Sequence, residues 1–96
     1  MSLHVFVRFE PRSGNEQQLR DELTGILAPT RTETGCIAIQ LYESTRDPFT
    51  LIIHSRWVDE AAFDAHAEMP HMKRFLGRVP KLITHSVEAV RTRPIG

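Results

Sequence analysis

The sequence predicts an α+β sandwich of the ferredoxin-like kind, in which strands and helices follow the order β-α-β-β-α-β. Four stretches of the chain alternate apolar and polar residues with period two, which is typical of strands. Between them, apolar residues recur at intervals of three and four, which is typical of helices that face a core. Only Ser44–Pro48 separates the second and third alternating stretches, so these two strands form an antiparallel pair. We expect one domain over residues 1–96, with the helices on one face of an antiparallel sheet.

The first half of the chain is predicted to form a strand, a helix and a second strand. The first strand covers residues 3–9 and ends at the turn residues 10–14. The helix starts at Asn15 and is closed by Pro29, and its apolar face consists of Leu19, Leu23, Ile26 and Leu27. After a polar turn at 30–35, residues 36–43 alternate again. One face of this strand carries Ile37, Ile39 and Leu41.

The second half is predicted to form a strand, two helices and a last strand. The third strand covers residues 49–57, with Trp57 facing the core and the pair His54 and Arg56 on the opposite face. Asp59 is a good N-cap for the first helix, because its carboxylate can accept a hydrogen bond from an amide of the first turn. Pro70 ends this helix and opens the next, which Pro80 stops near Val79. The last strand is expected at 83–90.

Composition excludes several classes of function. Twelve basic and twelve acidic residues give a net charge of zero, which argues against a nucleic-acid partner. Arg91 and Arg93 are expected to face solvent. Cys36 is the only cysteine, so no intramolecular disulfide forms, and no histidine lies close enough in sequence to suggest a nucleophilic thiol. No apolar run approaches the roughly 20 residues of a membrane span, and no secretory signal is present. We therefore expect a cytoplasmic protein without a membrane partner.

The sheet is expected to bury both of its faces. The strand face that turns away from the helices also carries apolar residues, and leaving it in water would expose a larger patch than monomers usually do. His4 and His85 are interpreted as strand surface or interface positions. We predict that this outer face packs against a second copy, giving a homodimer.

The stretch from Trp57 to Phe75 carries most of the candidate chemistry. It contains the only tryptophan, two of the five histidines and two of the five phenylalanines, gathered around a helix break. Such a concentration of rings and imidazoles indicates a pocket.

Motifs at four places in this order resemble the antibiotic biosynthesis monooxygenase family. They are Thr-Gly-Cys-Ile at 34–37, Ser-Arg-Trp at 55–57, Glu-Ala-Ala-Phe at 60–63, and His66 followed by Pro70-His71 and Phe75. The resemblance covers residues 5–90. It implies a homodimer whose two sheets stack into an α/β barrel, with a pocket between sheet and helices in each subunit. Members include cofactor-independent oxygenases of anthrones, quinols and related phenols; many others have no assigned activity.

Two departures from the family pattern stand out, and the haem-degrading branch fits poorly. Ser55 stands where many members carry an acidic residue, and Ala38 where an aromatic residue is common. The haem branch carries Asn where Val7 stands, Trp where His66 stands and a haem-ligating His where Leu76 stands. The resemblance therefore argues against haem cleavage.

The site predicted from the residues and the resemblance places His66 and His71 as catalytic residues and Trp57, Phe63 and Phe75 as substrate-binding walls. An oxygenase without metal or flavin needs a base that takes a proton from a phenol or quinol, and the resulting anion then reduces O2. Histidine suits this role because its ordinary pKa lies near neutrality. Each assignment has a structural alternative. His66 and His71 would instead hold or cap the helix ends, and the rings would be ordinary core.

The chain is therefore predicted to be a monooxygenase of a small aromatic or quinone-like molecule and O2, with no cofactor. The alternative is a non-catalytic dimeric module, or accessory subunit, that binds a hydrophobic aromatic ligand. No metal is expected: Glu68 adds a carboxylate to the two histidines, but no convincing third ligand is evident.

Overall fold

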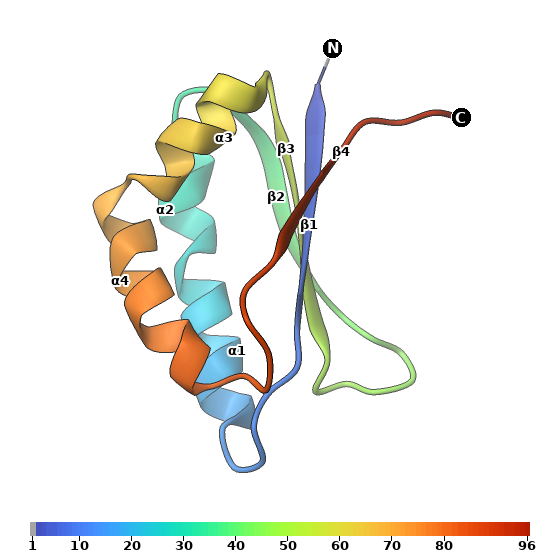
Figure 1. Cartoon of the computed structure of the whole chain (residues 1–96), viewed down its shortest axis with the longest axis vertical. Coiled ribbons are helices and arrows are strands. Elements are labelled where there is room, and N and C mark those ends of the chain that lie inside the picture. Colours follow the sequence, from blue (N-terminus) through green and yellow to red (C-terminus); the bar gives the residue numbers. More distant parts are fainter. Residues whose placement is uncertain (1) are drawn as a thin grey trace.

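One antiparallel sheet carries the helices on a single face, as the sequence predicts (Figure 1). The computed structural model describes residues 2–96. Its elements are β1 (Leu3–Phe9), α1 (Glu16–Gly25), α2 (Leu27–Arg31), β2 (Cys36–Glu43), β3 (Leu51–Trp57), α3 (Glu60–Ala67), α4 (Pro70–Arg78), the 3-10 turn η1 (Val79–Lys81) and β4 (Ala89–Thr92). The strand order is β2-β3-β1-β4, which is the ferredoxin-like order.

The core lies between the sheet and the helices and is built from alternate residues of the central strands. In β1, Leu3, Val5 and Phe9 are buried, and the register places Leu3 opposite Trp57 and Phe9 opposite Leu51 of β3. The helices add a matching apolar face, formed by Leu19, Leu23, Met72, Phe75 and Val79. The apolar residues that alternate along the strands therefore pack in one layer against the apolar residues that recur along the helices.

The prediction that Pro29 closes the first helix is wrong. The chain breaks at Ile26 instead, and Pro29 lies inside the short helix α2. A proline is tolerated there because the first turn of a helix has no intrahelical acceptor for its amide groups. The segment predicted as a polar turn at 30–35 accordingly begins with the last residues of α2.

Two other expectations are corrected by the way strands pair. A register shift between Cys36 and Ala38 turns Ile37 outward, so Ile37 is exposed although Ile39 is buried. The last strand is confined to 89–92, because β4 pairs with β1 only from His4 to Val7. Upstream, Ile83 makes an isolated bridge to Pro11, and the chain between Ile83 and β4 bends.

The outer face of the sheet carries an apolar and aromatic patch. Phe6 is 42% exposed and its cross-strand neighbour Val90 is 53% exposed. His54 stacks on the Phe6 ring and lies 2.9 Å from His4, measured from Nε2 to Nδ1. His54 and Arg56 thus lie opposite Trp57, as predicted. No helix in residues 2–96 has the length and apolar character needed to cross a membrane.

Candidate functional site

A partly enclosed cavity of about 180 Å³ lies between the sheet and the helices. Residues from β1, β2 and β3 form its floor, α3 and α4 supply much of its cover, and Val87 and Ala89 close one side. Within residues 2–96 the only polar side chains on its lining are Ser55 and His66. A cavity of this kind can hold a small apolar ring and presents it with one titratable group.

His66 reaches this cavity from the last turn of α3. Asp59 fixes the start of that helix, since its carboxylate accepts a hydrogen bond from the Ala62 amide at 2.8 Å, as predicted for an N-cap. The His66 side chain is buried, and its Nδ1 lies 2.8 Å from Oε2 of Glu33. Within residues 2–96 no hydrogen bond engages its Nε2. The ring is therefore held at one nitrogen and open at the other.

Glu33 is the residue that sequence reasoning missed. It lies in the turn between α2 and β2, its side chain is only 5% exposed, and the same oxygen that receives His66 also lies 2.8 Å from Nε2 of His71. The two histidines do not bond each other directly; the carboxylate bridges them. One acidic residue in a polar turn, 33 positions before His66, carries no signal in a single sequence that separates it from an exposed turn residue.

Gly35 explains why this turn comes so close to α3. Its φ of +87° lies in the left-handed region that glycine adopts readily. A Cβ at this position would lie 2.6 Å from the Cβ of Ala62, in the middle of α3. The Gly35 carbonyl also accepts a hydrogen bond from the Val58 amide at 2.9 Å. The small residues on both sides allow the turn to contact α3 and so bring Glu33 against His66.

Burial favours the uncharged form of His66. Desolvation lowers the pKa of His66 below its ordinary value, while the hydrogen bond and charge of Glu33 act in the opposite direction. A neutral imidazole that donates from Nδ1 to a carboxylate keeps Nε2 as an acceptor. His66 can therefore take a proton from a hydroxyl group placed in the cavity.

Trp57 packs against His66 but does not line the cavity. It is fully buried, and its Nε1 donates to the Ser55 hydroxyl at 2.9 Å. Its ring packs against the imidazole of His66 with centroids 4.7 Å apart, and edge-on against Phe63 at 5.7 Å. Ser55, which stands where many family members carry an acidic residue, thus accepts the hydrogen bond of the indole N–H.

The other predicted site residues divide into two groups. Phe63 and Phe75 line the cavity together with His66. His71 does not; it lies in the first turn of α4, beyond Glu33, and borders a hollow on the outer surface. The structure thus brings three of the five predicted site residues to the cavity wall and places Trp57 and His71 behind them.

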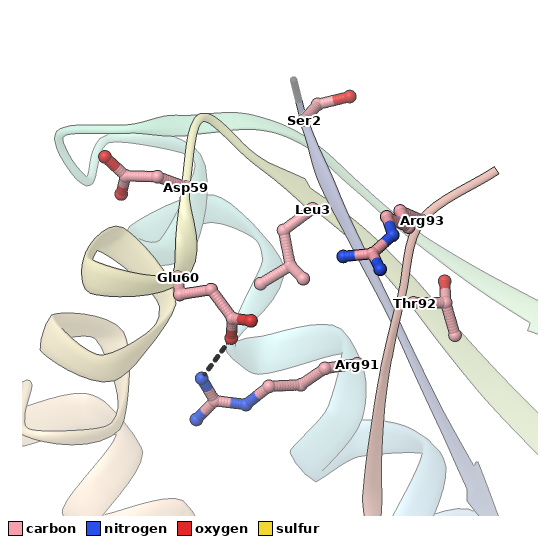
Figure 2. Close-up of a pocket in the computed structure, with 7 residues that line it drawn as sticks. All are labelled: Ser2, Leu3, Asp59, Glu60, Arg91, Thr92 and Arg93. Atoms are coloured by element: carbon pink, nitrogen blue, oxygen red, sulfur yellow. Dashed lines mark hydrogen bonds and ion pairs between the residues drawn. The ribbon is translucent and has the colours of Figure 1, made fainter.

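A larger hollow opens at the top of the sheet, where β4 meets the start of α3 (Figure 2). It measures about 620 Å³ and is lined by charged side chains, including Asp59, Glu60 and Arg93. Arg91 is exposed, as predicted, and it also pairs with Glu60 at 2.8 Å and Asp64 at 2.7 Å. Its guanidinium lies 4.8 Å from the centre of the Phe63 ring. This hollow is wide and open and has no contact with His66, so the smaller, partly enclosed cavity is the better candidate site.

The expectation that the two histidines lack a third ligand partner is also corrected. Glu68 is exposed and pairs with Lys73 at 3.3 Å. Glu33 takes its place beside His66 and His71, and one ligand atom from each of these three residues lies within 4.8 Å of the others.

Comparisons with known proteins agree with this architecture. Residues 2–78 match the family model described as antibiotic biosynthesis monooxygenase. The Mycobacterium tuberculosis protein named "Putative monooxygenase Rv0793" is 34% identical over 91 residues, covering 95% of this chain and 89% of the relative. The solved structure of Rv0793 superposes with a TM-score of 0.93 over 100% of this chain and 97% of that one. PA3566 from Pseudomonas aeruginosa, 24% identical, shares the fold with a TM-score of 0.90 over 99% of this chain and 95% of that one.

Proposed function

We propose that this chain, which belongs to the antibiotic biosynthesis monooxygenase family, is a cofactor-independent monooxygenase that oxidises a small quinol or related phenol with O2. One observation carries the proposal: a buried imidazole lines an apolar cavity, held at Nδ1 by a carboxylate and unengaged at Nε2. This is the arrangement a general base needs, because the base must be neutral, oriented and within reach of the substrate proton.

In the proposed reaction, Nε2 of His66 removes the hydroxyl proton of the substrate. The resulting anion is electron-rich and donates an electron to O2, and the two radicals combine to form a carbon–oxygen bond, which gives a hydroperoxide. The O–O bond then breaks: one oxygen atom stays on the ring and the other leaves as water, with all four electrons and both protons of the water supplied by the substrate, as when hydroquinone and O2 give hydroxybenzoquinone and water. The indole N–H of Trp57 is already donated to Ser55, so it is not free to stabilise the anion. The imidazolium formed on His66 supplies that stabilisation itself, at the point where the charge develops.

Glu33 acts as a positioning residue in this scheme. Its carboxylate fixes the tautomer of His66 and stabilises the positive charge that the ring acquires on proton transfer. His71 holds the same carboxylate oxygen from the other side and does not reach the cavity. We therefore assign the base role to His66, with Phe63 and Phe75 as the walls that hold a flat ring.

The size of the cavity favours a substrate with one ring. A buried apolar cavity of about 150 Å³ is sufficient to bind benzene in another protein, and the cavity beside His66 measures about 180 Å³. A hydroquinone or a singly substituted phenol fits this space better than a three-ring anthrone. The lining offers no charged anchor, so an uncharged substrate is preferred.

Oxygen uptake by the purified protein tests the proposal. We expect consumption with reduced benzoquinones and simple phenols and less with anthrone. His66→Ala should lower kcat by about 100-fold or more, and His85→Ala, which alters a histidine outside the cavity, should not. Full activity in His66→Ala would remove this residue as the base. If the pure protein turns over no member of the panel but binds ring compounds tightly, the alternative of a non-catalytic binding module replaces the enzyme.

We also propose that the functional unit is a homodimer joined through the outer face of the sheet. The support is the patch of Phe6, Tyr42 and Val90, each about half exposed in the single chain, since such contiguous apolar surface usually contacts protein. Phe6→Glu should convert a dimer to a monomer in sedimentation experiments. A wild-type protein that sediments only as an 11.0-kDa species at micromolar concentration would contradict the dimer.

A further inference from the structure

Glu33, His66 and His71 present a set of metal-ligand atoms, a property that the proposed reaction does not require. Two imidazole nitrogens and one carboxylate oxygen lie within 4.8 Å of one another, and each nitrogen is 2.8 Å from Oε2 of Glu33. Two histidines and one glutamate are a common set of protein ligands for Zn²⁺ in sites that keep a further position open. The three residues come from three separate segments, the α2–β2 turn, α3 and α4, so only the fold brings them together.

The charge of Glu33 favours a cation at this place. Its side chain is 5% exposed, and within residues 2–96 the groups that contact its carboxylate are the two imidazoles, with no lysine or arginine among them. A buried carboxylate is costly unless a positive charge neutralises it, and neither imidazole carries a permanent charge as a lysine or arginine does. A divalent ion bound by the oxygen and both nitrogens would supply that charge.

Binding an ion requires the three ligand atoms, which lie within 4.8 Å of one another, to move to the spacing of a metal site. With metal–ligand bonds of about 2.0–2.1 Å in a tetrahedral site, neighbouring ligand atoms lie roughly 3.3 Å apart. Each nitrogen–oxygen separation would therefore open by about half an ångström, which a side-chain rotation of Glu33 can provide. The hydrogen bond of His66 already aims its Nδ1 at this oxygen, whereas His71 Nε2 lies 2.8 Å from the oxygen and would turn to face the ion.

An ion can reach the cluster from outside. His71 borders a surface hollow of about 310 Å³ between α1 and α4. The rim of this hollow carries Asp21 and Glu22 as well as Arg74 and Arg78, and Arg78 pairs with Glu22 at 3.5 Å. The rim is therefore of mixed charge and leaves an aqueous route to the imidazole of His71, independent of the apolar cavity.

We propose that Glu33, His66 and His71 form a binding site for a divalent transition-metal ion, with Zn²⁺ as the representative, and that occupation of this site switches off His66 as a base. The metal takes Nδ1, so the proton of the neutral ring moves to Nε2. That nitrogen then donates to the cavity and no longer accepts a proton. This second part rests on the proposed function; the binding part does not.

Calorimetric titration of chelator-treated protein with Zn²⁺ tests the site. We expect one ion per chain, with Glu33→Gln and His71→Ala weakening binding by roughly 10-fold or more. His54→Gln is the matched control, because it removes one member of the other close imidazole pair, His4 and His54; it should bind as the wild type does. Titration with Co²⁺ should give the visible absorption of a tetrahedral nitrogen–oxygen site in wild type and control, and not in His71→Ala.

Three results would overturn the metal site: no Zn²⁺ binding below about 100 µM, equal affinity in wild type, Glu33→Gln and His71→Ala, or loss of binding in His54→Gln. Circular dichroism of each variant checks that it is folded. Should the protein bind Zn²⁺ as expected and show no oxygen uptake, the metal site stands and the monooxygenase proposal fails. Should it consume O2 with Zn²⁺ bound to one site per chain and undiminished rate, the switch fails.

Discussion

Removing the carboxylate of Glu33 should destabilise the protein more than removing any exposed acidic residue. In Glu33→Ala the buried His66 loses the hydrogen-bond acceptor of its Nδ1 at 2.8 Å, and the half-buried His71 loses the ionic contact of its Nε2 with the same oxygen at 2.8 Å. The hydrogen bond of His66 to this charged group contributes about 1.5–3 kcal/mol, and the ionic contact of His71 adds to it. The variant no longer has to bury a carboxylate, and this gain offsets part of the loss. We therefore expect the free energy of unfolding to fall by about 2–4 kcal/mol, which corresponds to at least about 8 °C in Tm for a chain of this length.

Two further variants show whether the effect comes from the hydrogen bonds. Glu33→Gln keeps the shape and one carbonyl acceptor, so it should cost about 1–2 kcal/mol. Glu68→Ala removes an exposed carboxylate whose only ion pair within residues 2–96 is with Lys73 at 3.3 Å, and it should cost less than about 0.5 kcal/mol. Urea denaturation with linear extrapolation measures all three variants. A Glu33→Ala variant as stable as Glu68→Ala would refute the stabilising role of the bridging carboxylate.

Two other predictions concern the surroundings of the site, and a third concerns His54 on the outer face of the sheet. Ser55→Ala should lower the free energy of unfolding by about 1–3 kcal/mol, since it leaves the buried indole N–H of Trp57 without an acceptor; Ser86→Ala, at an exposed position, should change it little in the same urea experiment. Gly35→Ala should cost about 2–4 kcal/mol, from the positive φ and the 2.6 Å approach to Ala62, whereas Gly25→Ala, with nothing within 4 Å, should be neutral or stabilising in thermal melts. Burial first, and then the charges of His4 and Arg56, lower the pKa of His54. The folded state therefore resists protonation of His54, so the stability that this histidine contributes is present above its ordinary pKa of about 6.5 and is lost as the pH falls. Between pH 7.5 and 5.0 the free energy of unfolding should fall more in the wild type than in His54→Gln. Equal losses would contradict this.

The parts of the fold that could be predicted are those fixed by local pattern. The alternation of β1 and β3 and the N-cap at Asp59 depend on residues a few positions apart, so they can be predicted from the sequence. Pro29 and the last strand were misplaced because distant partners decide them. The strand ends where β1 offers it no further pairing, and the helix break at Ile26 is set by packing against the core. Ile37 was assigned to the wrong face because a shift in strand register reverses the alternation.

The same distinction applies to the site. His66, Phe63 and Phe75 lie within one stretch of the chain, so their gathering in a pocket could be predicted from their spacing. Glu33 could not, because its partners are 33 and 38 positions away and its own neighbours are polar turn residues. The ion pairs of Arg91 could not be predicted for a similar reason: its two carboxylates are on α3, and nothing near it in the tail indicates them.

The motif that carries the family likeness can be explained largely by the need to hold one carboxylate. Gly35 and Ala62 are small so that the turn bearing Glu33 can touch α3, and Pro70 starts α4 where His71 reaches the same oxygen. Each of these residues would also be required in a protein that binds a ligand without catalysing a reaction. Nε2 of His66 is different, because no hydrogen bond within residues 2–96 needs it and the residue lines the cavity. That one nitrogen therefore supports catalysis more strongly than the motif as a whole does. A His66 variant that keeps the ligand affinity and loses the oxygen uptake would separate the two roles.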